Sequence, residues 1–147
     1  MGIDANAEVL VNVPREKVSA YATDPANDPV WVSGISQAKL LTEPPVGRGS
    51  QVDRVASFMG KHIEYVLEIV GWTPQTLMAM RSVKGSFPME VTYSFEDAPG
   101  GTLARINVKG GPGGFLKLVG PLMAMGVKKN ITKDLKNLKR LMEAGAD

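Results

Sequence analysis

The side chains that can take part in chemistry are few in this sequence, and they do not form a catalytic set. Histidine occurs once, at position 62, and cysteine is absent, which excludes disulfides and thiolate chemistry. In the segment HIEYVLEIV, His62 has the same strand parity as Glu64, so we expect both side chains to face solvent. A lone surface histidine supplies neither a base for a serine triad nor a metal cluster. We therefore expect no metal and no cofactor.

Two tyrosines are better candidates for contact with a ligand. Tyr65 and Tyr93 both occupy the apolar parity of their predicted strands. Such a tyrosine either packs in a core with its hydroxyl at a wet edge, or donates a hydrogen bond to a ligand oxygen in a mostly apolar pocket. The sequence favours neither reading over the other.

Whether an arginine is buried or exposed depends on which face of its strand it occupies. In the segment TLMAMRSV, one phase turns Met78 and Met80 inward and leaves Arg81 in solvent. The other phase makes Arg81 a buried polar contact that needs an acidic partner or an anionic ligand. Charged residues are rarely buried unpaired, so we favour the first phase. Arg54 and Arg105 are expected at the surface for the same reason.

Two features could suggest anion binding, a glycine-rich segment and a cluster of lysines, but neither has the pattern of such a site. The segment GGPGG, residues 110–114, contains neither a G-x-G-x-x-G pattern nor the G-K-[ST] ending of a phosphate loop, and reads as a turn or hinge. The net charge is only +2, which gives no reason to expect nucleic acid as a partner. The lysines near the C-terminus are interrupted by Asp134 and are expected to form a solvated helix face; they are Lys128, Lys129, Lys133, Lys136 and Lys139.

Composition indicates one globular domain over residues 1–147. Hydrophobic residues make up 44% of the chain and charged residues 22%, which is typical of a globular protein with a substantial core. The N-terminus lacks the pattern of a signal peptide, and no segment reaches the ~20 apolar residues that span a membrane. We expect a cytoplasmic protein.

The order of the predicted elements is a strand, two short helices, six strands and one long helix. Pro14 suits the first position of a helix, and the Asp24-Pro25 and Asp28-Pro29 pairs are typical of capped helix starts. The predicted strands occupy residues 8–13, 36–42, 49–57, 61–72, 76–83, 89–96 and 102–109. Several of them alternate apolar and polar side chains, so one face of an antiparallel sheet meets water and the other meets the last helix. This predicts an α+β fold.

Five segments in this order resemble the START-like (SRPBCC) superfamily of helix-grip proteins, and most of all its polyketide cyclase/dehydrase branch. The segments are VPREKVSAYATDP, WVSG, VGRGS, EIVGWTPQTL and GGTLARINV. The resemblance covers nearly the whole chain but includes no catalytic signature. It implies a curved antiparallel sheet of about seven strands wrapped around a long C-terminal helix, with an apolar cavity between them. Members of the family bind lipids, polyketides, quinones or similar molecules, and some act on them as enzymes.

The last helix adds a second argument for a cavity. Its second half carries the apolar stripe Val127, Ile131, Leu135, Leu138 and Met142. Projected backward at 3.6 residues per turn, that stripe meets Leu116, Gly120, Met123 and Ala124, two of which are very small. A packed core does not leave a gap of that size, so we expect a ligand to fill it. Pro121 would kink the helix and shift this phase.

The leading hypothesis is that the chain binds a small hydrophobic molecule between the sheet and the last helix. The candidate ligand-binding residues are Trp31, Tyr65, Leu67, Met78, Met80, Tyr93, Phe95, Gly120, Met123, Ala124 and Val127, with Arg81 as a candidate polar contact. The first alternative is an enzyme of the polyketide cyclase or dehydratase type. The second is a module that docks on a membrane, a partner or a second copy through Leu118, Leu122 and Met125.

Overall fold

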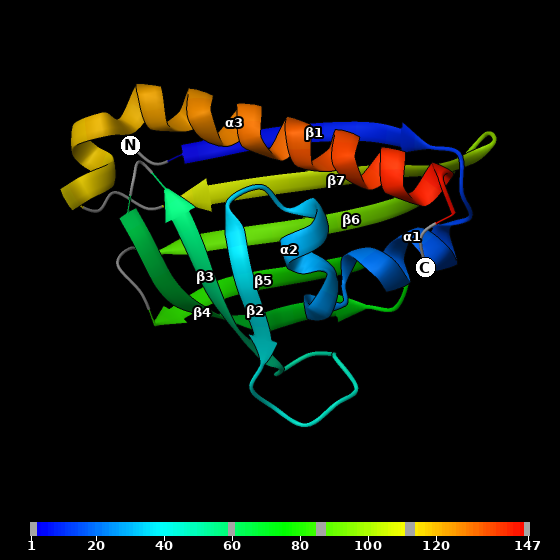
Figure 1. Cartoon of the computed structure of the whole chain (residues 1–147), viewed down its shortest axis with the longest axis horizontal. Helices are drawn as coiled ribbons and strands as arrows, with labels where there is room; N and C mark the ends of the chain where they lie inside the picture. Colours follow the sequence, from blue (N-terminus) through cyan, green and yellow to red (C-terminus); the bar gives the residue numbers. More distant parts are fainter. Residues whose placement is uncertain (1–2, 59–60, 85–87, 111–113, 146–147) are drawn as a thin grey trace.

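A single antiparallel sheet of seven strands forms the frame of the molecule, in the order β1-β7-β6-β5-β4-β3-β2. The computed structural model describes residues 3–58, 61–84, 88–110 and 114–145, with their side chains except those of residues 3, 58, 61, 84 and 114–124. The strands are β1 (Ile3–Val11), β2 (Ile35–Leu40), β3 (Gln51–Phe58), β4 (Lys61–Thr73), β5 (Leu77–Lys84), β6 (Met89–Ala98) and β7 (Gly101–Gly110). Figure 1 shows the sheet curving strongly, so that β2 and β3 pass in front of β5 and β6.

The helices close the open side of this curved sheet. They are α1 (Arg15–Ala22), the 3₁₀ helix η1 (Pro25–Asn27), α2 (Asp28–Trp31) and α3 (Gly114–Glu143). The first three connect β1 and β2, which are the two edges of the sheet, and α3 lies along β1 and β7 (Figure 1). Because α2 contacts both β2 and α3, a space is enclosed between these helices and the inner face of the strands.

The turn between α1 and α2 uses only one of the two predicted aspartate caps. The carboxylate of Asp24 accepts a hydrogen bond of 3.0 Å from the backbone N–H of Ala26 at the start of η1. Asp28 does not cap, because Asn27 holds the N-cap position of α2 and Asp28 is the first helical residue. The predicted cap role of Asp28 is therefore wrong, and its carboxylate is free to act elsewhere.

The long strand β4 contains the irregularities that let the sheet bend. Its register against β5 shifts between Val66 and Leu67 and again between Ile69 and Gly71. Such bulges bend a strand and increase its twist. A β-carbon on Gly71 would lie 3.2 Å from the Cβ of Ala79, so glycine permits the close approach of β4 and β5 at the second shift.

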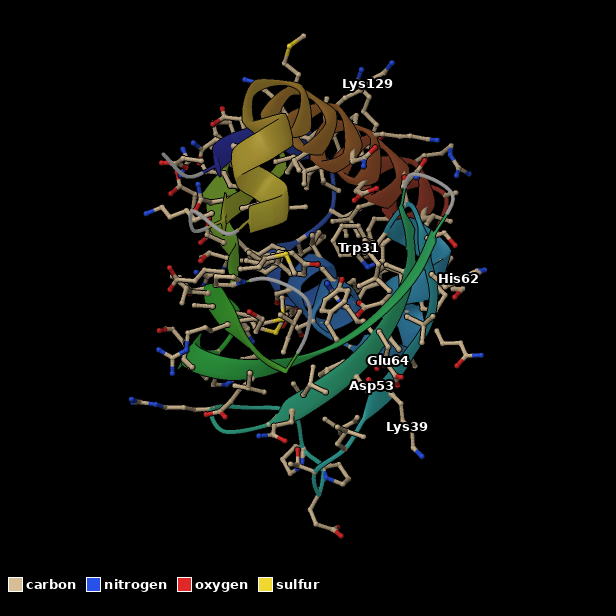
Figure 2. All side chains as sticks on the ribbon, turned by 90° about the vertical axis from the view of Figure 1, so that its left-hand side faces the viewer. Trp31, Lys39, Asp53, His62, Glu64 and Lys129 are labelled. Carbon is tan, nitrogen blue, oxygen red and sulfur yellow. The ribbon has the colours of Figure 1, made fainter. Side chains whose placement is uncertain are left out.

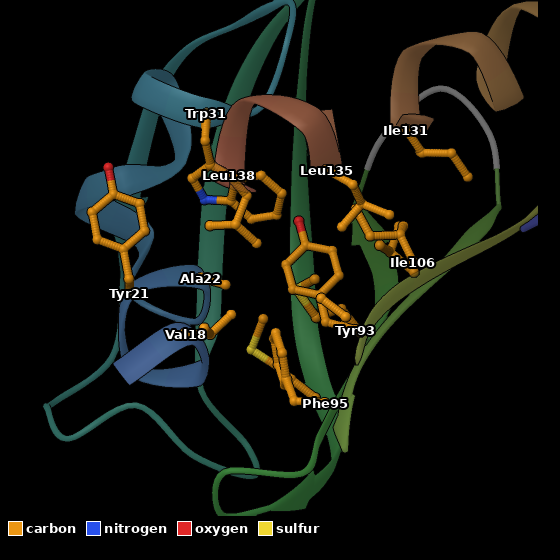
Figure 3. Close-up of a cluster of buried hydrophobic side chains, with 14 of the residues drawn as sticks. Val18, Tyr21, Ala22, Trp31, Tyr93, Phe95, Ile106, Ile131, Leu135 and Leu138 are labelled. Carbon is orange, nitrogen blue, oxygen red and sulfur yellow. The ribbon is translucent and has the colours of Figure 1, made fainter. Parts of the chain in front are cut away.

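The inner face of the sheet packs on the apolar stripe of α3. Figure 3 shows this core, in which side chains of α1, α2, β6, β7 and α3 meet. The predicted stripe is confirmed, since its residues from Ile131 onward are buried: Ile131, Leu135, Leu138 and Met142. The favoured phase of β5 is confirmed as well, because Met78 and Met80 are buried and Arg81 is exposed.

The α+β helix-grip architecture predicted from the sequence is thus confirmed, including the seven strands and the helical connection between the first two. Among the described residues, no helix is both long and apolar enough to cross a membrane.

Replacing Gly101 by alanine is expected to destabilise the protein by ~1–3 kcal/mol, because overpacking against a fixed backbone has that cost. A β-carbon there would overlap the backbone oxygen of Val11 and lie 2.9 Å from the Cα of Asn12. Gly126→Ala in α3 is the matched control. Its β-carbon meets nothing within 4 Å, so better helix propensity should stabilise the protein by ~0.5–1 kcal/mol. Urea unfolding measures the unfolding free energy of both variants. An unchanged unfolding free energy in Gly101→Ala would contradict the close approach at Gly101.

Candidate functional site

The sheet and helices enclose a cavity of about 320 Å³ between the inner face of the strands, the segment that joins α2 to β2, and α3. Small-molecule pockets have volumes from ~300 Å³ upward, so this cavity is large enough to hold a compact ligand. Figure 2 looks into the curved sheet from the end where β3 meets β4 and where β7 leads toward α3. The cavity wall combines apolar side chains with a few polar groups.

The part of the cavity nearest that end is lined mainly by apolar side chains, together with the exposed Ser57 and Asn130. Strand register pairs Ala56 with Ile63 and Val91 with Val108, and all four residues line the cavity. Val127 of α3 lines the same cavity from the helix side. These side chains offer no hydrogen-bonding group, so this level suits the apolar body of a ligand.

The polar groups lie two residues further along the strands. There Arg54 of β3 pairs in register with Tyr65 of β4, and Tyr93 of β6 pairs with Ile106 of β7. Asp134 of α3 follows Val127 by seven residues, which is two helical turns deeper. All five line the cavity, so its inner end brings together a guanidinium, two phenols and a carboxylate.

Arg54 is held in a buried ion pair. Its Nε and Nη2 lie 3.0 Å and 2.9 Å from Oδ2 of Asp28, and the two side chains are only 5% and 4% exposed. The Nη2 group also donates to the hydroxyl of Tyr93 at 3.2 Å. These contacts join α2 to β3 and β6, and none of them uses Nη1 of the guanidinium. An Arg54 that lines the cavity with one arm uncommitted can donate to a carbonyl or hydroxyl oxygen.

The environment fixes the charge states of this group. Burial opposes the charge on Arg54, but attraction from Asp28 and the two tyrosines outweighs it and holds the pKa of the guanidinium well above its ordinary value. Burial raises the pKa of Asp28, and Arg54 offsets part of that rise. Burial likewise raises the pKa of Tyr93 to about 12, against a lowering by Arg54. Tyr93 is therefore a neutral phenol near pH 7, and its proton is available to an acceptor.

Asp134 brings a second carboxylate to the inner end. The residue is 4% exposed, and its Oδ1 accepts a hydrogen bond of 2.7 Å from the backbone N–H of Ser33. This bond ties α3 to the segment between α2 and β2. Burial raises the pKa of Asp134, while hydrogen bonding from Ser33 lowers it. Among the described residues no cationic nitrogen lies within 4 Å of this carboxylate.

Trp31 packs against Tyr93 on the side away from the cavity. Its ring centroid lies 5.5 Å from that of Tyr93, with the planes tilted at 58°, an arrangement favoured for aromatic pairs. The indole is 1% exposed and lies in the core next to Leu138 and Tyr93 (Figure 3). Its Nε1 is buried without a hydrogen-bond partner in the described part of the chain. Trp31 therefore fixes the position of Tyr93 rather than lining the cavity.

The structure brings together only some of the residues that the sequence nominated. Tyr65, Tyr93 and Val127 line the cavity. Five others are buried in the core and are not part of the cavity wall: Trp31, Leu67, Met78, Met80 and Phe95. Gly120, Met123 and Ala124 lie outside the described side chains, so their predicted place in the wall stays a prediction.

Two candidate polar residues, Arg81 and His62, lie outside the cavity. Arg81 is exposed on the outer face of β5, and His62 is exposed on β4 with Nδ1 3.2 Å from the hydroxyl of Ser57. Met125 is 70% exposed, close in sequence to Lys128 and Lys129, whereas Leu118 and Leu122 lie outside the described side chains. No further observation on the described residues supports a docking surface there.

Two site residues, Arg54 and Asp134, were missed or misread from the sequence. The expected surface position of Arg54 is wrong. Arg54 is buried because Asp28 neutralises its charge, and the sequence did not indicate this partner. Asp134 was noted only as an interruption of the lysines, yet it is three residues from Ile131 and four from Leu138 and so lies on the buried stripe. The available signal for Arg54 was the alternation in QVDRVAS, which places it on the same face as Val52.

Comparison with known proteins gives the family context. The family model described as "Polyketide cyclase / dehydrase and lipid transport" matches residues 3–143. None of the curated proteins compared with the chain matches it. Among solved structures, TTHA0849 from Thermus thermophilus is similar with a TM-score of 0.82 at 21% identity, over 97% of this chain and 99% of that one.

Two further solved structures carry functional or family names. The Zhui aromatase/cyclase from Streptomyces sp. R1128 has a TM-score of 0.81 at 14% identity, over 100% of both chains. A START superfamily protein from Mycobacterium smegmatis has a TM-score of 0.69 at 17% identity, over 92% of this chain and 98% of that one. At these identities the likeness shows a shared fold.

Asp28→Asn is expected to cost about 3–5 kcal/mol of unfolding free energy, because it leaves the Arg54 guanidinium buried without a counter-charge. Adding Arg54→Met to this variant removes that charge and keeps the aliphatic volume, so it should recover most of the loss. Arg105→Met is the control. Its pairs with Glu8 and Glu96 are exposed, so the change should cost no more than ~1 kcal/mol. Urea unfolding of the double-mutant cycle measures the coupling, and additive effects of the two inner substitutions would contradict the ion pair.

Proposed function

Because the chain belongs to the polyketide cyclase/dehydrase and lipid transport family, we propose that it binds a small, mostly apolar ligand in the cavity between the sheet and α3. The observation that carries this proposal is the separation of the wall into two levels. An apolar body would lie between Ala56, Ile63, Val91 and Val108, and a polar end would meet Arg54, Tyr65, Tyr93 and Asp134.

The polar level explains the orientation of such a ligand. An oxygen on the inner end would accept hydrogen bonds from Arg54 or from the phenol of Tyr93, and a donor on the same end would be accepted by Asp134. Burying these groups against an apolar surface would leave them unpaired, at a cost of ~1–3 kcal/mol for each unsatisfied group. The reverse orientation is therefore disfavoured.

Filling the apolar level should remove binding without loss of stability. Ala56→Phe is expected to weaken binding of the uncharged probe N-phenyl-1-naphthylamine at least about tenfold, which is ~1.4 kcal/mol, because the phenyl ring takes the space of the ligand. The melting temperature should remain close to that of the unmodified protein, since the ring enters a cavity and not a packed core. Probe fluorescence and thermal unfolding measure the two effects.

The matched control is Val55→Phe, which adds a similar ring on the outer face of the same strand and should leave probe binding unchanged. Absence of probe binding by the unmodified protein, or equal binding by Ala56→Phe, would refute the proposed pocket.

A second candidate function is supported by the presence of a guanidinium and a second carboxylate, that of Asp134, in one cavity. In this function Asp134 removes a proton from the carbon next to a ligand carbonyl, and Arg54 and Tyr65 stabilise the oxygen of the enolate that forms. The enolate carbon then attacks a second carbonyl of the same molecule, the alkoxide that forms takes the proton from Asp134, and elimination of water completes a cyclisation. The wall supplies the base and the electrophilic donors of this reaction class.

The first step of that reaction is testable without knowledge of the natural substrate. In D₂O, the unmodified protein should accelerate deuterium exchange at the methyl group of 2-acetylnaphthalene, followed by NMR. Asp134→Asn should reduce the acceleration by ~10²-fold or more, the lower end of what a positioned base contributes. Asp53→Asn, on the outer face of β3, makes the same charge change and should have no effect. Tight binding of the ketone with no acceleration would favour a carrier over an enzyme.

A further inference from the structure

The charges at the inner end of the cavity do not cancel. The Arg54 guanidinium lies 2.9 Å from the carboxylate of Asp28, and both side chains are almost fully buried. That pair is neutral as a unit. Asp134 lines the cavity beside it, and no cationic nitrogen in the described part of the chain lies within 4 Å of its carboxylate. Asp28 lies behind the wall, so the inner end as a whole holds two carboxylates and one guanidinium.

Arg54 is not available as a binding site for an anion. A ligand carboxylate would meet a guanidinium whose charge Asp28 already balances through Nε and Nη2, and Asp28 is itself only 3% exposed. Removing Asp28 from Arg54 would strand a buried charge, which costs more than the new contact returns. The uncommitted Nη1 still donates to a neutral oxygen without disturbing the pair.

Asp134 also keeps its own position when a ligand enters. Its Oδ1 accepts the backbone N–H of Ser33 at 2.7 Å, and this bond joins α3 to the segment that follows α2. A ligand anion placed at the same level would meet this fixed carboxylate in a low-dielectric interior, where like charges repel more strongly than in water. It would also lose its own hydration without a free counter-charge.

On these grounds we propose that the cavity selects uncharged ligands, with a hydroxyl, carbonyl or amide at the inner end, and excludes free carboxylates of the same size and shape. This inference rests on the proposed binding function and assigns its ligand class. Asp134 is the residue that sets the selectivity, and Arg54 with Asp28 is the neutral hydrogen-bonding partner.

Two probes of nearly equal shape separate charge from size. At pH 7, 2-naphthamide is uncharged and 2-naphthoate is an anion, and both are fluorescent. The unmodified protein is expected to bind the amide at least about tenfold more tightly than the carboxylate, a difference of ~1.4 kcal/mol. In Asp134→Asn the excess charge is gone, so the preference for naphthamide over naphthoate should fall at least about tenfold, mainly because naphthoate binds more tightly than before. Asp53→Asn makes the same charge change on the outer face of β3 and should leave both affinities as they were.

The possible outcomes test the charge selectivity and the binding function separately. Equal binding of amide and carboxylate by the unmodified protein, or a preference that Asp134→Asn leaves intact, would overturn the charge selectivity while the pocket itself stands. Failure of naphthamide, naphthoate and N-phenyl-1-naphthylamine to bind at all would overturn the proposed binding function and this inference with it. Loss of naphthamide binding in Ala56→Phe confirms that the measured site is the cavity.

Discussion

Arg54 and Asp28 face each other at 2.9 Å in the interior, where both side chains are almost fully buried. Such a pair persists only if both partners stay in place, because an unpaired buried charge costs several kcal/mol. Arg54 belongs to β3 and Asp28 to α2, and the bond from Arg54 to Tyr93 extends the constraint to β6. The position of the short helix on the curved sheet therefore depends on these contacts, and so does the inner end of the cavity.

The remaining parts of the site follow from that anchor. With α2 fixed, Trp31 packs against Tyr93, and the backbone N–H of Ser33 points at Asp134 of α3. One side of the pocket is thus built by α2 and the residues after it, and the other by strands whose register sets the depth of each side chain. Apolar pairs such as Ala56 and Ile63 occupy one level, and Arg54 with Tyr65 the next. The same hydrogen bonds hold the fold together and form the polar end of the cavity.

The fold is compatible with several activities, so the wall chemistry must carry any functional argument. The wall holds a neutralised guanidinium, two tyrosines and a carboxylate with no cationic nitrogen within 4 Å of it in the described chain. This combination provides hydrogen bonds to an uncharged polar group and a base beside an electrophile. Binding uses the first property alone, whereas catalysis on a carbonyl requires both.

The sequence by itself determined the architecture of this protein. Alternation in MEVTYSFE placed Val91, Tyr93 and Phe95 inward, and the spacing of Ile131, Leu135, Leu138 and Met142 fixed the buried face of α3. These patterns are local, and each element shows its own period. The polar end of the cavity was decided only by the tertiary structure, because whether a charge can be buried depends on its partner. Arg54 and Asp28 are 26 residues apart, and Ser33 and Asp134 are 101 apart. No local period records that such residues meet, so the sequence argument placed Arg54 at the surface and left Asp134 unassigned, and only the folded sheet and helices brought them to one cavity.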